Sequence, residues 1–510
     1  MGLPLLTCLL CLPLIAGGLL LALRNLLPAT LSRFMAVFFS AASTALSLWL
    51  ISHYQQDAAV FQWAESHHWI PVLGAQYSLA VDGIALSLIV LTNVMTFFVL
   101  FMADPKMDSF AEYQAGFLLM QGLICGALAA TDALLFYVFW EAMLVPIFLL
   151  IGIYGGTNRI YATVKFFLYT FLGSVFLLLA LLYLHHQAAL QGVPIEQSFA
   201  INSFQSLAIS ESAQHWLFWA FLLAFAVKIP MFPLHTWLPD AHVEAPTGGS
   251  VILAAILLKM GAYGFLRFIL PITPLASLHW STFLIVLSLI GIVYIGFVAL
   301  VQNDLKKLIA YSSIAHMGFV TLGLVFALKF AAIQDHDSAL MAIQGAFVQM
   351  ISHGLISGAL FFCIGILYER LHSRLIKDYG GVANVMPAFA ALFLFFAMSN
   401  AGLPGTSGFV GEFLVILSAF KMSLLSAILA ALTLILGASY SLWMTKRVLF
   451  GPTNPVTVMG LKDIGCKEQS VLMILAALVL CLGLWPEPLL KLNEASLSEI
   501  LIRAMAARSH

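Results

Sequence analysis

The sequence has few charged residues for its length, and this shortage excludes most soluble folds. Only 9% of its 510 residues are Asp, Glu, Lys or Arg, whereas 62% are hydrophobic and the mean hydropathy is +1.02. Soluble domains carry about 25% charged residues, because polar side chains must cover their surfaces. Lipid is the solvent that tolerates a surface without them. The composition therefore predicts a polytopic membrane protein.

Several sequence signatures of chemistry are also missing. No GxGxxG or Walker sequence is present, so we expect nucleotide chemistry to take place on other chains. The net charge is −1 and no basic stripe is present, so no nucleic-acid partner is expected. The six cysteines lie mostly in apolar runs, which is typical of small buried hydrophobes, and we expect no metal site. The N-terminal apolar run lacks a basic flank and a clear cleavage site, and it is interpreted as a retained first span.

Long apolar runs divide the chain into membrane spans, since about 20 apolar residues cross a bilayer as a helix. We predict an all-α fold with about 14 transmembrane helices in a single integral membrane domain, 1–510. The expected spans are 3–23, 34–52, 82–103, 114–131, 133–153, 161–184, 215–238, 247–270, 280–301, 308–328, 338–368, 387–420, 423–447 and 470–490. Asp132 is expected to cap the fifth span, and Asp304 the tenth.

The basic residues set the expected orientation. Of the 22 Lys and Arg residues, 14 lie on the side of the loops that follow odd-numbered spans, 6 lie on the opposite side and 2 lie inside spans. The positive-inside rule then places both termini outside. The loops 53–81 and 185–214 contain no Lys or Arg, as expected for external segments.

Ionisable residues interrupt the apolar spans. The stretch "FYVFWEAMLVPIF", residues 136–148, contains one carboxylate, at Glu141. Burying an isolated charge costs several kcal/mol or more unless it is paired, hydrated or neutralised, so intramembrane ionisable residues are candidates for function. The complete set of candidates is Glu141, Lys228, Lys259, His316, His353 and Glu412.

Two of the expected spans carry helix-breaking residues beside one of these candidates. Span seven contains Pro230 and Pro233 next to Lys228, and span twelve contains Pro404 in "GLPGTSG" before Glu412. Paired broken helices at corresponding places mark inverted repeats in transporters. Discontinuous helices seven and twelve therefore predict two inverted five-helix repeats, spans 4–8 and 9–13. The corresponding segments are 1–103, 104–270 (first repeat), 271–450 (second repeat) and 451–510.

This pattern indicates a proton relay. If a Glu141–Lys228 ion pair opens, Lys228 loses the charge that stabilises its ammonium and tends to release its proton. Lys259 and the two histidines could then carry it, because imidazole titrates near neutral pH. Glu412 would be the far end, and His235, after the break, is a supporting residue beside Pro230 and Pro404.

Structural roles remain open for each candidate. Glu141 could lock two helices as an ion pair, and Lys228 could cap carbonyl groups freed by the break. Lys259 could extend towards the headgroups, and Glu412 could cap a helix N-terminus. The histidines could bond neighbouring hydroxyls, or hold a haem, although two helices do not make a haem bundle.

Four motifs together resemble one family. The stretches "FWEAMLVPIF", "KIPMFPLHTWLPDAHVEAPTGGSVILAAILLKMGAYG", "NDLKKLIAYSSIAHMGF" and "GLPGTSGFVGEF" resemble the antiporter-like membrane subunits of NADH–quinone oxidoreductase, respiratory complex I. The resemblance covers nearly the whole chain. An acid at Glu412 makes it most similar to the M-type subunits, since the L- and N-type chains usually have Lys there.

The resemblance implies proton translocation driven by electron transfer from NADH to quinone elsewhere in a complex. Glu141 would gate Lys228, while Lys259, His316 and His353 would lie on a central polar axis that ends at Glu412. It implies no cofactor in this chain, with NADH, FMN, Fe–S clusters and quinone on partner subunits. The neighbours would be L- and N-type subunits in a bacterial inner membrane. A multi-subunit cation/proton antiporter or a membrane-bound hydrogenase shares this architecture and is the alternative.

Overall fold

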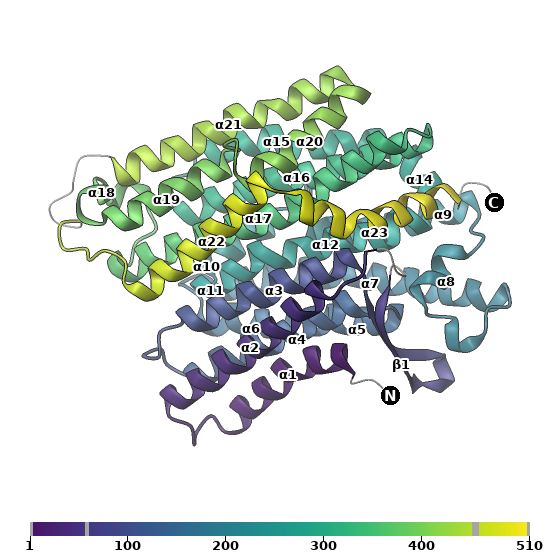
Figure 1. The fold of residues 1–510 in the computed structure, drawn as a ribbon, viewed down its shortest axis with the longest axis horizontal. Helices are drawn as coiled ribbons and strands as arrows, with labels where there is room; N and C mark the ends of the chain where they lie inside the picture. The colour runs from purple at the N-terminus through teal and green to yellow at the C-terminus, as the bar shows by residue number, and fades with distance from the viewer. Residues whose placement is uncertain (1–3, 57–60, 451–457, 507–510) are drawn as a thin grey trace. The chain divides into compact units, whose positions relative to one another are not determined.

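The computed structural model describes residues 4–56, 61–450 and 458–506, and helices dominate these residues (Figure 1). The chain folds into two compact units. The first comprises residues 1–228, 260–280 and 491–510, and the second comprises residues 229–259 and 281–490. The predicted all-α polytopic membrane fold is confirmed, apart from one short hairpin described below.

In the first unit, two apolar helices begin at aspartates that cap them. Asp82 caps α3 by accepting a hydrogen bond from the Ala85 amide. Asp132 caps α5 as predicted, because its carboxylate accepts from two backbone amides of the first turn. The helices are α1 (Leu5–Ala22), α2 (Ala29–Ser52), α3 (Gly83–Met102), α4 (Phe110–Ala129), α5 (Ala133–Ala142), α6 (Leu144–Tyr154), α7 (Arg159–Leu190), α8 (Ile201–Ser206), α9 (Glu211–Lys228), π-helical η4 (Phe265–Ile269), α13 (Leu270–Ile272) and α14 (Pro274–His279).

The second unit is built around two long helices that lie side by side, α16 and α17 (Figure 1). Asp304 caps α16 as predicted, by accepting from the amides of Lys306 and Lys307. The helices are α10 (Trp237–Glu244), α11 (Thr247–Ile252), π-helical η3 (Leu253–Leu257), α15 (Ser281–Leu300), α16 (Leu305–Ala332), α17 (His336–Leu371), α18 (Val382–Val385), α19 (Pro387–Asn400), α20 (Ser407–Met422), α21 (Leu424–Leu449) and α22 (Cys466–Leu484).

Two helices are divided between the two units. In α12 (Leu258–Gly264), residues from Met260 onward belong to the first unit. The other is α23 (Glu487–Ala506), a 20-residue helix at the C-terminal end of the described chain, whose residues from Lys491 onward belong to the first unit. Within that unit Asn493 donates to the Ser87 hydroxyl, and the Ser496 hydroxyl accepts from the Gly83 amide.

A β-hairpin occupies the predicted external loop 53–81. Strands β1 (Gln62–Ile70) and β2 (Ala75–Val81) pair antiparallel around a turn with Gly74 at φ +72°. An isolated two-stranded hairpin is marginally stable. Here Glu65 accepts hydrogen bonds from the Leu6 and Thr7 amides, which ties β1 to the start of α1. The all-α prediction missed this hairpin because a tertiary contact, not the strand pattern, stabilises it.

Eleven helices or helix runs in the described residues are long and apolar enough to span a membrane. They correspond to eleven of the 14 expected spans. The other three are α4 and the two expected broken helices, each of which is divided into separate helices. The total of 14 and the inverted-repeat relationship remain predictions.

Both expected helix breaks are present. Helix α9 ends at Lys228, and the chain passes through irregular residues 229–236 before α10 begins. Helix α19 ends at Asn400, and α20 begins only at Ser407. In the second break Gly402 and Gly405 have φ values of +80° and +90°, a conformation that glycine adopts without the steric cost of a Cβ.

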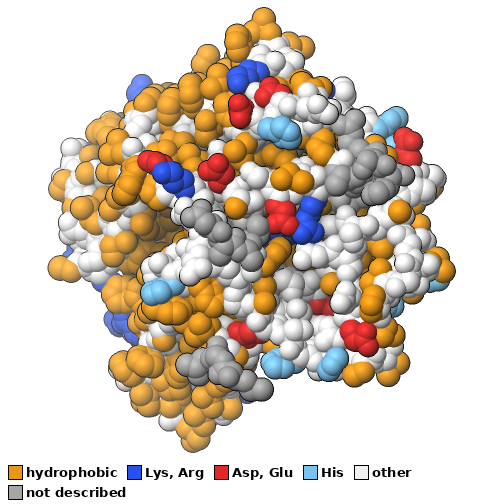
Figure 2. Space-filling view, turned by 45° about the vertical axis from the view of Figure 1, so that its right-hand side comes forward, with side chains coloured by type: hydrophobic (Ala, Val, Ile, Leu, Met, Phe, Trp, Pro, Cys, Tyr) orange, Lys and Arg blue, Asp and Glu red, His pale blue; other side chains and the backbone are white. Residues whose placement is uncertain are grey.

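Hydrophobic side chains cover large continuous areas of the visible surface, and charged side chains form small scattered groups (Figure 2). Helix α7 illustrates the pattern, because apolar residues such as Leu168, Leu172 and Leu179 are more than half exposed. Exposed apolar area on this scale marks contact with lipid or with another membrane protein.

Candidate functional site

The ionisable candidates fall into two groups, one in each unit. Glu141 and Lys228 belong to the first unit, whereas Lys259, His316, His353 and Glu412 belong to the second. All six lie in helices, and all except the half-buried Glu141 are at most 4% exposed. The contacts within each group determine whether it can hold or transfer a proton.

Lys228 ends α9, and its ammonium is held by an aromatic ring. Its Nζ atom lies 4.4 Å from the centre of the Trp140 ring and makes no hydrogen bond to any described residue. A desolvated cation–π contact contributes about 2 kcal/mol. The last turn of a helix also favours a cation, by roughly 0.3–1 kcal/mol. These contributions offset only part of the several kcal/mol that burial of a charge costs.

Glu141 lies one residue after Trp140 on α5 and acts on Lys228 through its charge. Within the described residues no ion pair of 4 Å or less joins the two side chains, and Glu141 Oε1 makes no hydrogen bond. The Trp140 indole donates to the Ser174 hydroxyl of α7 at 3.1 Å, which fixes the ring. The closed pair expected from the sequence is therefore not formed here. The two groups interact at longer range, with the indole beside the ammonium.

Lys259 is completely buried and has two hydrogen-bond partners. Its Nζ lies 2.6 Å from the Ala254 carbonyl oxygen and 2.6 Å from Nδ1 of His353 on α17. Ala254 lies in the π-helical segment η3, five residues earlier in the chain. Such π-turns are frequent at functional sites because they change the direction of a carbonyl group. Since a protonated lysine only donates, His353 Nδ1 accepts and its other nitrogen, Nε2, carries the hydrogen.

His316 and Glu412 form a second hydrogen-bonded pair in the same unit. His316 Nδ1 lies 2.8 Å from Glu412 Oε1. The Gln349 amide nitrogen lies 3.2 Å from the same carboxylate oxygen. Because an imidazole Nδ1–H that donates to Glu412 cannot also accept, the Gln349 amide is assigned as a donor to the carboxylate. Glu412 thus accepts two hydrogen bonds in a site that is 2% exposed.

The two pairs meet at the histidines. The ring centroids of His316 and His353 are 5.6 Å apart, and neither Nε2 atom bonds a described residue. A Lys259-to-Glu412 sequence therefore has one gap, between two imidazoles whose planes are tilted by 46°. Transfer across it requires a ring rotation or a bridging water.

The supporting residues lie in the breaks but differ in their contacts. Pro230 and His235 lie between α9 and α10, and the His235 ring stacks on Phe232 with centroids 5.6 Å apart. Pro404 is exposed. In the same break, a methyl group added at Gly402 would lie 3.1 Å from Glu412 Oε2.

Three polar contacts of the site, made by Gln349, Trp140 and Ser174, were not predicted from the sequence. Gln349 lies four residues before His353 on α17, so its polar character at helical spacing in an apolar span was an available signal. Trp140 adjoins Glu141, but an indole in an apolar run is indistinguishable from core without the fold.

The chemistry of both groups suits proton transfer. No cluster of three or more His, Cys, Asp or Glu side chains that could hold a metal ion occurs in the described parts of the chain. Each group instead combines a lysine with a carboxylate, and the second adds two imidazoles that can both accept and donate a proton.

Comparisons with known proteins agree on one family. The sequence model described as "NADH:quinone oxidoreductase/Mrp antiporter, TM" matches residues 130–437. The chain is 43% identical to NADH-quinone oxidoreductase subunit M of Rhodobacter capsulatus, over 92% of this chain and 90% of the relative. It is similar to a chain of respiratory complex I from Thermus thermophilus with bound NADH, with 31% identity, a TM-score of 0.84 and coverage of 98% and 99%. It shares its fold with a chain of the Mrp complex from Dietzia sp. DQ12-45-1b, with 19% identity, a TM-score of 0.84 and coverage of 100% and 99%.

Proposed function

Because the chain belongs to the NADH:quinone oxidoreductase/Mrp antiporter family of membrane subunits, we propose that it is the proton-translocating M-type subunit of an NADH–quinone oxidoreductase. The observation that carries this proposal is the buried sequence Lys259–His353 and His316–Glu412 in the second unit. Four ionisable groups at membrane depth are expensive to keep unless they move or hold charge.

In the proposed cycle, the first unit controls when a proton is released. With Glu141 held away, the Lys228 ammonium has only the Trp140 ring and the helix end to stabilise it. Movement of the carboxylate towards Lys228 would favour the charged form, and its withdrawal would favour the neutral form. Glu141 thus acts as the gate, and Lys228 as the group that takes up and releases the proton.

In the second unit, the residues form the path. Lys259 donates a proton to His353 Nδ1, and His353 releases its Nε2 hydrogen towards His316. His316 Nδ1 then passes its own hydrogen to Glu412. Each transfer leaves the donor neutral or in its other tautomer, so net movement is one proton from Lys259 to Glu412. Gln349 holds the receiving carboxylate in place.

Electron transfer would take place on other chains of the complex. We propose that NADH, FMN, Fe–S clusters and quinone bind partner subunits, because no nucleotide motif is present in this sequence. The neighbouring membrane subunits would be the L- and N-type chains. The complex would lie in a bacterial inner membrane, with both termini of this chain outside, as the distribution of basic residues indicates.

A subunit of a cation/proton antiporter or a membrane-bound hydrogenase is the second candidate, because the fold also matches a chain of an Mrp complex. That match has 19% identity and supports the fold alone. Co-purification in mild detergent separates the two functions. NADH-oxidising peripheral subunits would support the proposal. Antiporter subunits together with sodium-dependent transport would support the alternative.

The direct test is Lys228→Ala in the assembled complex, reconstituted into vesicles. We expect NADH-driven proton pumping to be abolished while the subunits still co-purify, because the group that holds the proton is gone. Lys106→Ala, at an exposed position, is the matched control and should pump normally. Normal pumping by Lys228→Ala would refute the relay.

The gate is tested by comparing two substitutions of Glu141. Glu141→Gln removes the charge and should reduce pumping nearly as much as Lys228→Ala. Glu141→Asp keeps the charge and should be milder. Equal effects of both would indicate that Glu141 acts through its shape, not its charge.

A further inference from the structure

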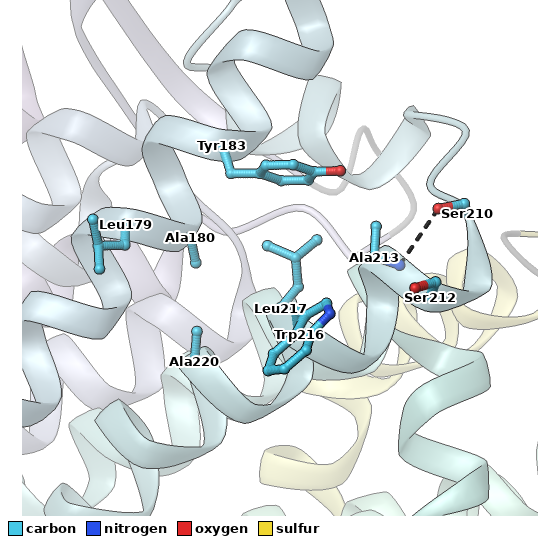
Figure 3. Close-up of a pocket in the computed structure, with 9 residues that line it drawn as sticks. All are labelled: Leu179, Ala180, Tyr183, Ser210, Ser212, Ala213, Trp216, Leu217 and Ala220. Atoms are coloured by element: carbon cyan, nitrogen blue, oxygen red, sulfur yellow. Dashed lines mark hydrogen bonds between the residues drawn. The ribbon is translucent and has the colours of Figure 1, made fainter.

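A groove lies between α7 and α9 in the first unit. Neither Glu141 nor Lys228 is among the residues that line it. Its volume is about 470 Å³, within the range of roughly 300–1,000 Å³ typical of ligand sites. Figure 3 shows the rings of Tyr183 and Trp216 on opposite sides of the space, with Leu179 and Ala220 at one end. Ser210 and Ser212 lie at the other end. The groove is therefore apolar at one end and polar at the other.

The polarity changes along the direction of the helices. Ser210 caps α9 by accepting from the Ala213 amide, so the serine end is the helix end. Ala220 lies nine residues into α9 from Glu211, or about 13 Å deeper at 1.5 Å per residue. Tyr183 and Trp216, which are 39% and 78% exposed, lie between the two ends. Aromatic residues with a polar tip favour the level of the lipid headgroups, so this groove passes from the interface into the apolar region.

The charge at the polar end selects among headgroups. The connection 185–214 contains Glu196 and Glu211 but no Lys or Arg. Glu211 is exposed and, in the sequence, lies between the two serines that line the groove. Arg503 of α23 donates to Asn202 and Gln205 in the same connection, but at the start of α9 an anionic headgroup would meet the Glu211 carboxylate. An ammonium group would be attracted to it. The serine hydroxyls can donate to phosphate oxygens.

From these observations we propose that the α7–α9 groove binds one phospholipid whose headgroup carries a primary ammonium, with an acyl chain beside Leu179 and Ala220 and the ammonium near Glu211. This site is additional to proton translocation. It gives the first unit a lipid that extends from the start of α9 to the level of Ala220.

The test uses the intact complex, purified in mild detergent and exposed to phosphatidylethanolamine with a photoreactive group on its acyl chain. We expect labelling in peptides that contain 179–183 and 216–220. Ala220→Trp should fill the apolar end and remove the label. Ala477→Trp, at an exposed position of α22, is the matched control and should keep it.

Competition tests the headgroup. Unlabelled phosphatidylethanolamine should compete about tenfold better than phosphatidylglycerol, a difference of about 1.4 kcal/mol, and Glu211→Gln should remove this preference. Three results would overturn the proposal: no label in these peptides, equal competition by both lipids, or a cross-link from a photoreactive residue at position 216 to another subunit. The last would show that protein covers the groove.

Discussion

Lys228 and Lys259 are both buried ammonium groups, but they are stabilised differently. Lys259 has two hydrogen-bond acceptors, the Ala254 carbonyl and His353 Nδ1, each at 2.6 Å. Lys228 has the face of Trp140 and the end of α9. Because the second arrangement is weaker, the charge of Lys228 depends more on Glu141. This difference supports the proposal that the first unit gates proton release and the second conducts the proton.

The contribution of the indole is tested by Trp140→Leu. Loss of a cation–π contact of about 2 kcal/mol should leave Lys228 less able to hold its proton and should reduce pumping strongly without preventing assembly. Proton uptake by inverted membrane vesicles during NADH oxidation measures this. Trp49→Leu, at an exposed position of α2, should pump normally. A Trp140→Leu variant with wild-type pumping would contradict the assigned role.

Gln349 is tested by substitutions that keep its size. Gln349→Leu removes the amide that donates to Glu412, and a hydrogen bond to a charged group contributes about 1.5–3 kcal/mol. We expect partial loss of pumping, smaller than the loss for Glu412→Gln. The pumping rate per NADH oxidised measures both variants. If Gln349→Leu is the more damaging of the two, the amide is a member of the path and not a support.

The sequence was informative about charged residues because the membrane makes each of them costly. All six candidates lie in helices, and four of them are brought together in one unit. Whether they carry protons remains a prediction. Gln349 and Trp140 were missed because neither carries a charge, and their importance depends on which helix packs beside them. A closed Glu141–Lys228 ion pair was also expected but is not formed. The distance between two side chains on different helices cannot be read from the sequence.

At the scale of elements, irregular helix segments lie beside Lys259 and Glu412. The π-helical segment η3 aims the Ala254 carbonyl at Lys259. The turn between α19 and α20 places Gly402 against Glu412. Glycine is needed there twice over, because φ is +80° and because a methyl group would approach Oε2 to 3.1 Å.

Gly402→Ala should therefore be damaging. Backbone strain of about 1 kcal/mol or more would combine with displacement of the carboxylate from His316. We expect pumping to fall while the subunit still assembles, as judged by its recovery in the purified complex. Gly18→Ala is the control, since a methyl group there meets no atom within 4 Å. Equal activity of the two variants would mean that the break does not position Glu412.

Proline and glycine made the two breaks predictable, and Asp132 and Asp304 made two helix starts predictable. The hairpin β1–β2 and the helix α23 were not predicted. Both segments lie outside the long apolar runs, and both are held by contacts with residues distant in the sequence. Glu65 of β1 accepts a hydrogen bond from the start of α1, and Ser496 of α23 accepts one from the Gly83 amide. Local patterns do not contain those contacts.

At the scale of the whole molecule, two units each contain a lysine and a carboxylate in buried helices. Composition alone predicted the membrane fold, because 9% charged residues cannot cover a soluble surface. The division of the chain into units could not be predicted in the same way. It depends on which helices pack together, and α12 and α23 each contribute to both units.

The central claim is that protons move along the buried groups of the second unit. The most direct measurement is the number of protons pumped per NADH oxidised by the reconstituted complex that carries Lys259→Met, which keeps the length of the side chain and removes its charge. The account predicts that this ratio falls well below the wild-type value, and falls further than in His353→Ala, while the subunits still co-purify. An unchanged ratio in the fully assembled Lys259→Met complex would contradict it.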